Sequence, residues 1–267
     1  MKRLERFRDI MDLVEKTGNA SIPYLSGALG VSESTVRRDL TAMTAMREYR
    51  DARRVHGGLV LGAEGNGVEL MFELKLEQNR DLKEAVALAA SHFIEDGDSI
   101  ILDSGTTCFY LARCLKDRKR LHVLTTDVMV AAELARNPDI ETNIVGGAVR
   151  PGYYTIGGLA ALADIDRFVA EKVFLSVDAV DMEQGITNAS EFEVGIKQKL
   201  IRQGKRIFIL ADATKFGRRA LHKVEDLSRV HTIVTNSVLA EDIKAHLRGQ
   251  GAELVLAGPS KRKAETP

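Results

Sequence analysis

The chain has 267 residues, 45% of them hydrophobic, and as many basic as acidic residues. This composition supports one large or two smaller folded domains and excludes a largely disordered chain. Its apolar runs are shorter than the roughly 20 residues of a membrane span, and the first ten residues lack a signal-peptide core. The two cysteines, Cys108 and Cys114, argue against a disulfide framework and fit a reducing cytoplasm.

Charge is unevenly distributed along the chain. Residues 1–60 hold 11 lysines and arginines against 8 aspartates and glutamates, a net charge of +3, which leaves −3 for the rest. A basic N-terminal part indicates contact with nucleic acid. Differences of this size are common, so the pattern has weight only together with the motifs.

Three short helices are predicted at the N-terminus. Apolar residues at helical spacing predict a first helix over residues 3–17. Ser21 is a suitable cap for a second helix, which Gly30 ends, and Ser32 caps a third. The second helix would direct four side chains to the core: Tyr24, Leu25, Ala28 and Leu29. A tight turn between the second and third helices predicts a helix-turn-helix.

The next segments set the domain boundaries. Residues 41–52 look helical but lack a clear end, and residues 53–58 predict a β-wing with a glycine turn. We therefore expect a DNA-binding domain over residues 1–57 and a glycine-punctuated linker over 58–74. A sensing and oligomerisation domain would cover 75–256, and a disordered tail 257–267.

The second domain alternates helices and strands. Helices are predicted over 82–94, 107–116, 127–136 and 237–249, with a polar helix before residue 173. Strands are predicted over 99–103, 121–125, 141–145, 173–177, 207–211, 232–235 and 253–256. This alternation predicts an α/β fold with a largely parallel sheet.

The third predicted helix, within "VSESTVRRDL", has the composition of a recognition helix. Val36 and Leu40 are four residues apart and can face the core, so hydroxyls and arginines are left for phosphates and base edges. The wing would add basic contacts to the DNA backbone. The candidate DNA-binding residues are Ser32, Ser34, Thr35, Arg37, Arg38, Arg53, Arg54 and His56. The alternative is a solvated helix with an Arg38–Asp39 pair.

A second candidate site begins at "ILDSGTT", where a strand ends in a turn of small residues that opens a helix. Exposed amides and hydroxyls at such a turn suit a phosphate, although a plain strand-to-helix turn would have the same composition. The residues are Asp103, Ser104, Gly105, Thr106 and Thr107.

Other strand ends contribute further candidates for the same crevice, because ligands of open α/β sheets bind beyond the carboxyl ends of strands. Aspartates could accept hydrogen bonds from sugar hydroxyls, and Lys215 could balance a phosphate or simply be an exposed loop lysine. These candidates are Thr125, Asp127, Gly147, Asp178, Asp212 and Lys215.

Together these motifs resemble the DeoR family of bacterial transcriptional repressors. The residues that carry the resemblance are "VSESTVRRDL", "RRVHGG", "ILDSGTT", "VGGAVR", "FLSVDAVDMEQGIT" and "ADATKFGR". The resemblance extends over residues 3–256. It implies a winged helix-turn-helix that binds an operator, joined to a sugar-phosphate sensor with a ribose-5-phosphate-isomerase-like fold.

One segment departs from the family pattern. "TAMTAMREYRDARRVHGG" lacks the glycine that usually precedes the wing and is about three residues longer. Either the helix continues further or the wing is displaced.

The isomerase-like fold raises the possibility of catalysis. Glu191 and Lys197 lie where such enzymes keep an acid and a lysine, but the glycine-rich lysine loop is missing after Asp178. Loss of catalysis with retention of binding is the simpler interpretation, so both residues are candidate effector contacts. They are six apart on a helix and would not meet.

Other chemistry has little support in the sequence. The six histidines are scattered, no metal-ligand spacing occurs, and no dinucleotide or P-loop motif is present, so we expect no metal and no cofactor. Cys108 begins a predicted helix, where the pKa of a thiol can be lowered. A buried structural cysteine is the favoured interpretation.

The sequence therefore predicts a cytoplasmic, DNA-binding repressor of carbohydrate genes. Its partners would be a double-stranded DNA operator and a phosphorylated sugar effector, and it would form a homodimer or homotetramer. One alternative is an active sugar-phosphate isomerase with a DNA-binding head. Another is an oligomeric scaffold without a ligand.

Overall fold

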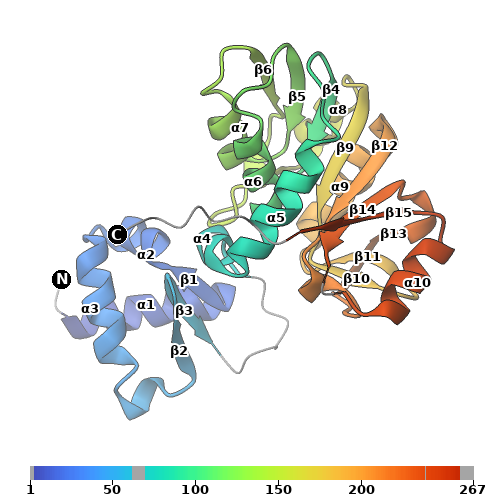
Figure 1. The fold of residues 1–267 in the computed structure, drawn as a ribbon. Helices are drawn as coiled ribbons and strands as arrows, with labels where there is room; N and C mark the ends of the chain where they lie inside the picture. The colour runs from blue at the N-terminus through green and yellow to red at the C-terminus, as the bar shows by residue number, and fades with distance from the viewer. Residues whose placement is uncertain (1–2, 62–69, 238, 259–267) are drawn as a thin grey trace, which may run out of the picture. The chain divides into compact units, whose positions relative to one another are not determined.

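A computed structural model of the chain describes residues 3–61, 70–237 and 239–258. The chain divides into two compact units, Met1–Gln78 and Asn79–Pro267, both drawn in Figure 1. No helix in the described ranges is both long enough and apolar enough to cross a membrane.

The first unit is built from helices and a small antiparallel sheet of order β1-β3-β2. Its elements are α1 (Arg3–Thr17), β1 (Asn19–Ser21), α2 (Ile22–Leu29), α3 (Glu33–Met43), η1 (Arg47–Tyr49), β2 (Ala52–Val55), β3 (Gly58–Leu61) and α4 (Phe72–Glu77). The three predicted helices are confirmed. Ser21 and Ser32 cap α2 and α3, and Gly30, with a φ of 63°, ends α2.

Helices α1, α2 and α3 share one apolar core. Phe7, Leu25, Val36 and Leu40 are fully or almost fully buried there, as the apolar spacing predicts. The expectation for Ala28 is wrong, because this residue is exposed near the end of α2 and Ile22 is buried instead. The short α2 therefore packs through its first turns.

The prediction of a helix over residues 41–52 is largely wrong, because the segment between α3 and β2 does not form an α-helix. Helix α3 ends at Met43, its last buried apolar residue, and a single 3-10 turn, η1, precedes β2. The position of the wing strands is nevertheless fixed, because β3 pairs with β1 as well as with β2. At Gly58 a Cβ atom would lie 2.2 Å from the carbonyl oxygen of Ala20, so this pairing requires glycine.

The range 58–74, expected to be a linker, contains regular structure at both ends. Strand β3 begins at Gly58, and α4 begins at Phe72. The side chain of Asn19 accepts a hydrogen bond of 2.8 Å from the amide of Met71. Residues 62–69 of this range, and residues 259–267 of the expected tail, lie outside the described residues.

A seven-stranded parallel sheet forms the centre of the second unit, with strand order β15-β14-β12-β9-β4-β5-β6. Its strands are β4 (Ser99–Leu102), β5 (Leu121–Thr125), β6 (Ile140–Ile144), β9 (Ala170–Ser176), β12 (Gly204–Leu210), β14 (Thr232–Asn236) and β15 (Glu253–Ala257). Every predicted strand of this domain is present, with slightly different bounds.

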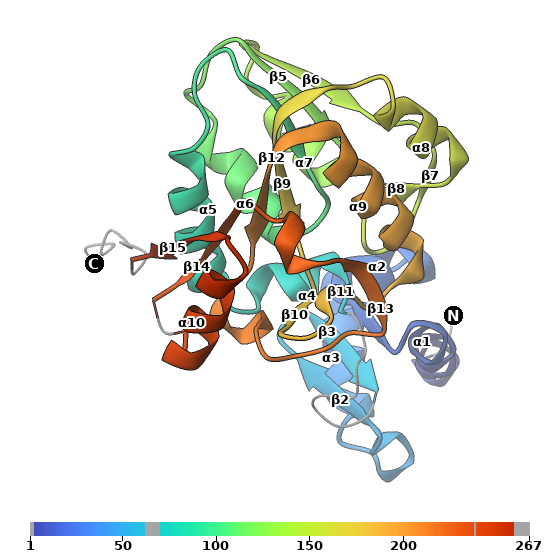
Figure 2. The same ribbon diagram turned by 90° about the vertical axis from the view of Figure 1, so that its right-hand side faces the viewer.

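Helices cover both faces of this sheet. They are α5 (Arg80–Ser91), α6 (Thr106–Cys114), α7 (Val128–Leu134), α8 (Leu159–Ile165), α9 (Glu191–Gln203) and α10 (Glu241–Gly249), with 3-10 turns η2 (Ala213–Lys215) and η3 (Leu227–Arg229). Figure 2 shows α5 and α6 on one side of the sheet and α9 on the other.

The order in which strands are added to the sheet reverses between β4 and β9, although all seven strands are parallel. From β4 the chain continues to β5 and β6, whereas from β9 it continues to β12, β14 and β15 on the opposite side. Because crossovers between parallel strands are right-handed, the two series place their helices on opposite faces. This reversal is the switch point at which open α/β sheets bind ligands.

Two small antiparallel elements were not predicted. One is a sheet of β10 (Ala179–Asp181), β11 (Gly185–Asn188) and β13 (His222–Glu225), and the other is a hairpin of β7 (Ala148–Val149) and β8 (Ile156–Gly157). These strands are too short to give a periodic signal in the sequence.

Aromatic packing consolidates the sheet centre. The rings of Phe174 and Phe208 are stacked with their centroids 4.6 Å apart, and both side chains are fully buried. Phe93 adds a third ring at 5.2 Å from Phe208. Strands β9 and β12 are thereby joined to the segment that follows α5.

Replacing Phe208 with alanine should lower the free energy of unfolding of the second unit by about 3–5 kcal/mol, because a large cavity would remain between packed rings. Chemical denaturation followed by circular dichroism measures this change. Leu221→Ala, at a side chain that is 83% exposed, is the control and should change stability by less than about 0.5 kcal/mol. Equal effects of both substitutions would contradict this account of the core.

Candidate functional site

Hydroxyl groups gather at the start of α3. Ser32 Oγ lies 2.9 Å from Ser34 Oγ and 3.0 Å from Thr35 Oγ1, and it accepts a hydrogen bond from the Thr35 amide. Ser32 and Ser34 are exposed and Thr35 is half-buried. The first turn of this helix thus presents donors and acceptors to solvent.

Both arginines of α3 lie on its exposed side. Arg37 forms a surface ion pair of 2.7 Å with Glu33, and Arg38 donates to the carbonyl of Ser34. The alternative Arg38–Asp39 pair is wrong, because Asp39 points inward. Its carboxylate instead accepts hydrogen bonds from two arginines of α1, Arg3 and Arg6.

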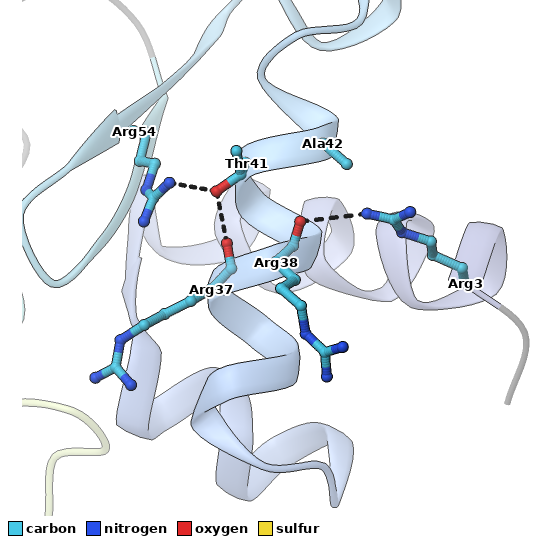
Figure 3. A pocket seen from close by; sticks show the side chains of 6 residues that line it. All are labelled: Arg3, Arg37, Arg38, Thr41, Ala42 and Arg54. Atoms are coloured by element: carbon cyan, nitrogen blue, oxygen red, sulfur yellow. Dashed lines mark hydrogen bonds between the residues drawn. The ribbon is translucent and has the colours of Figure 1, made fainter.

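The wing is joined to the recognition helix by a side-chain contact. Arg54 donates to the hydroxyl of Thr41, which itself donates to the carbonyl of Arg37 at 2.8 Å (Figure 3). Arg53 and His56 are exposed on the same wing. All eight predicted DNA contacts therefore lie on α3, its cap or the wing.

A hollow on this surface includes residues that sequence reasoning missed. Four arginines line it, one of them from α1 (Figure 3). The lining residues are Arg3, Arg37, Arg38, Thr41, Ala42 and Arg54. The position of Arg3 depends on how α1 packs across α3, and no local pattern signals it.

In the second unit, polar residues follow the carboxyl ends of four adjacent strands. Asp103 follows β4 and Asp127 follows β5, while Asp178 lies beyond β9 and Asp212 beyond β12. Since parallel strands end at one edge of a sheet, these groups form a row. The row crosses the switch point between β4 and β9.

The turn after β4 is fixed from two sides. Gly105 has a φ of 114°, and a Cβ there would lie 3.0 Å from Ser176 Oγ. Asp127 accepts hydrogen bonds from the amides of Gly105, Met129 and Val130 at 3.0, 2.7 and 3.1 Å.

The hydroxyl of Thr125 accepts the amide of Asp127. Ser104, Thr106 and Thr107 are buried along the same turn and the first residues of α6. The five residues of "DSGTT" thus form one ordered turn against the ends of β5 and β9.

A buried ion pair joins this turn to α9. Lys197 Nζ donates to Asp103 and to the carbonyl of Ser176, the latter at 2.8 Å. Burial opposes the charge of Lys197, but the carboxylates of Asp103 and Glu193 outweigh it and raise the pKa of the ammonium. Burial raises the pKa of Asp103 above its usual value, and Lys197 only partly offsets this effect. The ammonium of Lys197 and the amide of Ser176 both donate to Asp103, which favours its carboxylate form.

Glu193, and not the predicted Glu191, belongs to this group. Glu191 is exposed at the start of α9. Glu193 is buried, accepts hydrogen bonds from the side chains of Thr155 and Asn188, and lies 3.8 Å from Lys197. The signal for it was the spacing, because residues four apart on a helix face each other.

The hairpin of β7 and β8 adds another basic group. Arg150 forms an ion pair of 3.2 Å with Glu193 and lies 3.6 Å from the ring centroid of Tyr153. Gly147, a predicted effector residue, is exposed; a Cβ there would lie 2.4 Å from the carbonyl oxygen of Gly157. Its glycine is therefore explained by close packing within the hairpin.

Asp212 belongs to a neighbouring group at the ends of β12 and β14. Its Oδ1 accepts the amide of Thr214 at 2.9 Å, and Asn236 accepts the amide of Ala213. Within the described residues, its buried Oδ2 atom has no hydrogen-bond partner. Lys215 is half-buried, so the alternative of an exposed loop lysine is wrong.

The half-buried Asp178 accepts the amide of Ala189. Cys108 is fully buried, and burial raises the pKa of its thiol well above the usual value. The favoured interpretation of a structural cysteine agrees with this environment, whereas a lowered thiol pKa does not. Among the described residues, no group of three histidine, cysteine or acidic side chains is placed to hold a metal ion.

The stability of the second unit should depend on pH through Asp127. Burial raises the pKa of this carboxyl to about 6, although the amides of Gly105, Val130 and Met129 lower it. The folded chain therefore binds the proton more tightly than the unfolded chain. The resulting stabilisation is present below about pH 4 and is lost as the pH rises to about 6.

As the pH rises from about 4 to about 6, the unfolding free energy of the wild type should fall relative to that of Asp127→Asn. The difference between the two proteins should change by at most about 3 kcal/mol. Parallel curves for the two proteins would contradict the assignment of a raised pKa to Asp127.

Two family models match the chain. The DeoR-like helix-turn-helix domain matches residues 6–64, and the DeoR C terminal sensor domain matches residues 78–237. Solved structures similar to part of the chain include ribose 5-phosphate isomerase A of Methanocaldococcus jannaschii. That likeness has a TM-score of 0.39 and 18% identity, and covers 52% of this chain and 55% of that chain.

Curated relatives are similar over almost the whole chain. The putative sgc region transcriptional regulator of Escherichia coli K12 is 35% identical, over 96% of this chain and 97% of its own length. The putative aga operon transcriptional repressor of Escherichia coli O157:H7 is 31% identical, over 95% and 94%. These relatives are regulators, which supports a DNA-binding regulator and not an isomerase. The chain belongs to the DeoR family of transcriptional regulators.

Proposed function

We propose that the protein represses carbohydrate-catabolic genes and leaves its operator when a phosphorylated sugar binds the sensor unit. It acts in the cytoplasm as a homodimer or homotetramer. The observation that carries the proposal is the row of polar strand ends at the switch point, which includes a buried ion pair and an ordered Ser/Thr turn. The name of the aga operon relative supports repression over activation.

The DNA-binding role of α3 rests on the groups it presents. Its exposed hydroxyls and two arginines are suited to base edges and phosphates in the major groove. Ser32, Ser34 and Thr35 would act at the first turn, where free amides also favour a phosphate. Arg53, Arg54 and His56 of the wing would contact the DNA backbone.

The charges of the sensor unit favour one orientation of the effector. Lys197 already faces Asp103 and Glu193, so an added phosphate would gain little there. The amides at the start of α6 and the hydroxyls of Thr106 and Thr107 suit the phosphate better. The sugar hydroxyls would then face the carboxylates along the strand ends, among them the Oδ2 of Asp212, which has no hydrogen-bond partner among the described residues.

Coupling between the two units follows from linkage. An effector lowers operator affinity only if it binds the DNA-free arrangement of the protein better than the DNA-bound one. A tenfold loss of operator affinity requires a differential affinity of about 1.4 kcal/mol. A repeated half-site operator bound by a dimer or tetramer would distinguish two such arrangements through the spacing of the heads.

Arg37→Ala and Arg38→Ala should each weaken binding to duplex DNA, because each removes a phosphate or base contact. If the lost contact is with a phosphate, the salt dependence of binding should also become weaker, by about one released ion for each charge removed. Fluorescence anisotropy at several salt concentrations measures both quantities. Arg136→Ala, at a largely exposed arginine of the sensor unit, is the control. Unchanged binding in both α3 variants would remove this helix from the interface.

A phosphorylated pentose or hexose should raise the melting temperature of the full-length protein. Ligand at 100 times its Kd stabilises by about 2.7 kcal/mol. The response should be lost in a Thr106→Ala/Thr107→Ala variant and weakened in Glu193→Gln, while the exposed Glu191→Gln keeps it. Absence of a response to every sugar phosphate would favour a ligand-free scaffold, and turnover of the ligand would favour an isomerase.

A further inference from the structure

Arg3 extends the basic surface around α3 to the first helix of the chain. Its Nη2 donates to the carbonyl of Arg38 at 3.3 Å, and its Nε donates to Asp39 at 3.1 Å. Arg54 of the wing is held against the same helix through Thr41. Figure 3 shows Arg3 and Arg54 on opposite sides of α3, with Arg37 and Arg38 between them.

The charges around Asp39 leave Arg3 in excess. One carboxylate serves two guanidinium groups, and its shorter contact, 2.7 Å, is with Arg6. The side chain of Arg6 is only 14% exposed, whereas that of Arg3 is 54% exposed. Arg6 thus balances the buried carboxylate, and Arg3 brings the additional positive charge to the surface.

The guanidinium of Arg3 is also restrained in its direction. Its central carbon lies 5.5 Å from the ring centroid of Phe7, one turn further along α1. Contacts to Phe7, Asp39 and the Arg38 carbonyl together reduce the number of conformations open to this long side chain. Less conformational entropy is then lost when the guanidinium binds a ligand.

We propose that Arg3 contacts the DNA phosphate backbone on the side of α3 opposite the wing. The inference rests on the proposed function, in which α3 lies in the major groove. A helix in that groove, about 12 Å wide, lies between two phosphate backbones. Arg54 faces one of them and Arg3 the other, so the helix is held from both sides.

This contact differs in kind from base recognition. A phosphate contact carries no direct sequence information but fixes the register and orientation of the helix on the duplex. Arg3 therefore raises affinity for any duplex by a similar factor. The effect is separable from the operator preference that the α3 side chains provide.

The test measures salt dependence with the full-length protein and a fluorescein-labelled duplex of random sequence. Arg3→Gln keeps a hydrogen-bond donor for the Arg38 carbonyl but removes the charge. It should make the plot of log affinity against log salt less steep by about one and weaken binding by about three- to tenfold. Arg3→Lys, which keeps the charge, should have the same salt dependence as the wild type. Arg8→Ala, at an exposed arginine of α1 outside the hollow, should leave it unchanged.

Thermal unfolding without DNA separates this effect from damage to the fold. Because Arg6 keeps Asp39 paired, the melting temperature of Arg3→Gln should remain close to that of the wild type. A slope that falls in Arg54→Ala but not in Arg3→Gln would overturn the inference and leave the proposed function intact. Duplex affinity unaffected by Arg37→Ala, Arg38→Ala and Arg54→Ala would overturn the proposed function itself.

Discussion

The ion pair of Asp103 and Lys197 joins the two halves of the sensor sheet where its strand order reverses. Asp103 directly follows β4, and Lys197 reaches it from α9, beside the end of β9. Apolar substitutes for such a buried pair are often neutral or stabilising, so stability alone does not account for it. Around the pair, Glu193, Asp127 and the turn at Gly105 form one connected polar network. The candidate effector site is this network.

A similar arrangement organises the DNA-binding unit. Asp39 lies in the middle of "RRDL", where the sequence suggests a partner for the preceding arginine. In the structure it binds α1 instead. Arg37 and Arg38 are thereby left on the exposed face, and α1 and α3 are held at a fixed distance. One inward-facing carboxylate thus separates the structural charges of the head from those available to DNA.

Much of the fold was predictable because it depends on local signals. Caps at Ser21 and Ser32, the apolar spacing of α1 and α3, and the strand runs of the parallel sheet all specify their elements directly. The sequence also identified the polar residues that follow the carboxyl ends of β4, β5, β9 and β12. It missed Glu193, Arg150 and Arg3, because their positions depend on packing between segments distant in the chain. Short strands such as β7 and β8 have no periodic signal.

The segment between α3 and the wing, residues 44–51, has ends that are fixed independently, at the end of α3 and at the pairing of β3 with β1. The entropic cost of closing a loop rises only slowly with its length, by about 0.6 kcal/mol for each doubling. Insertions here are therefore nearly neutral for folding. Evolution can vary the tip of the head at this place without disturbing the helix that meets the operator.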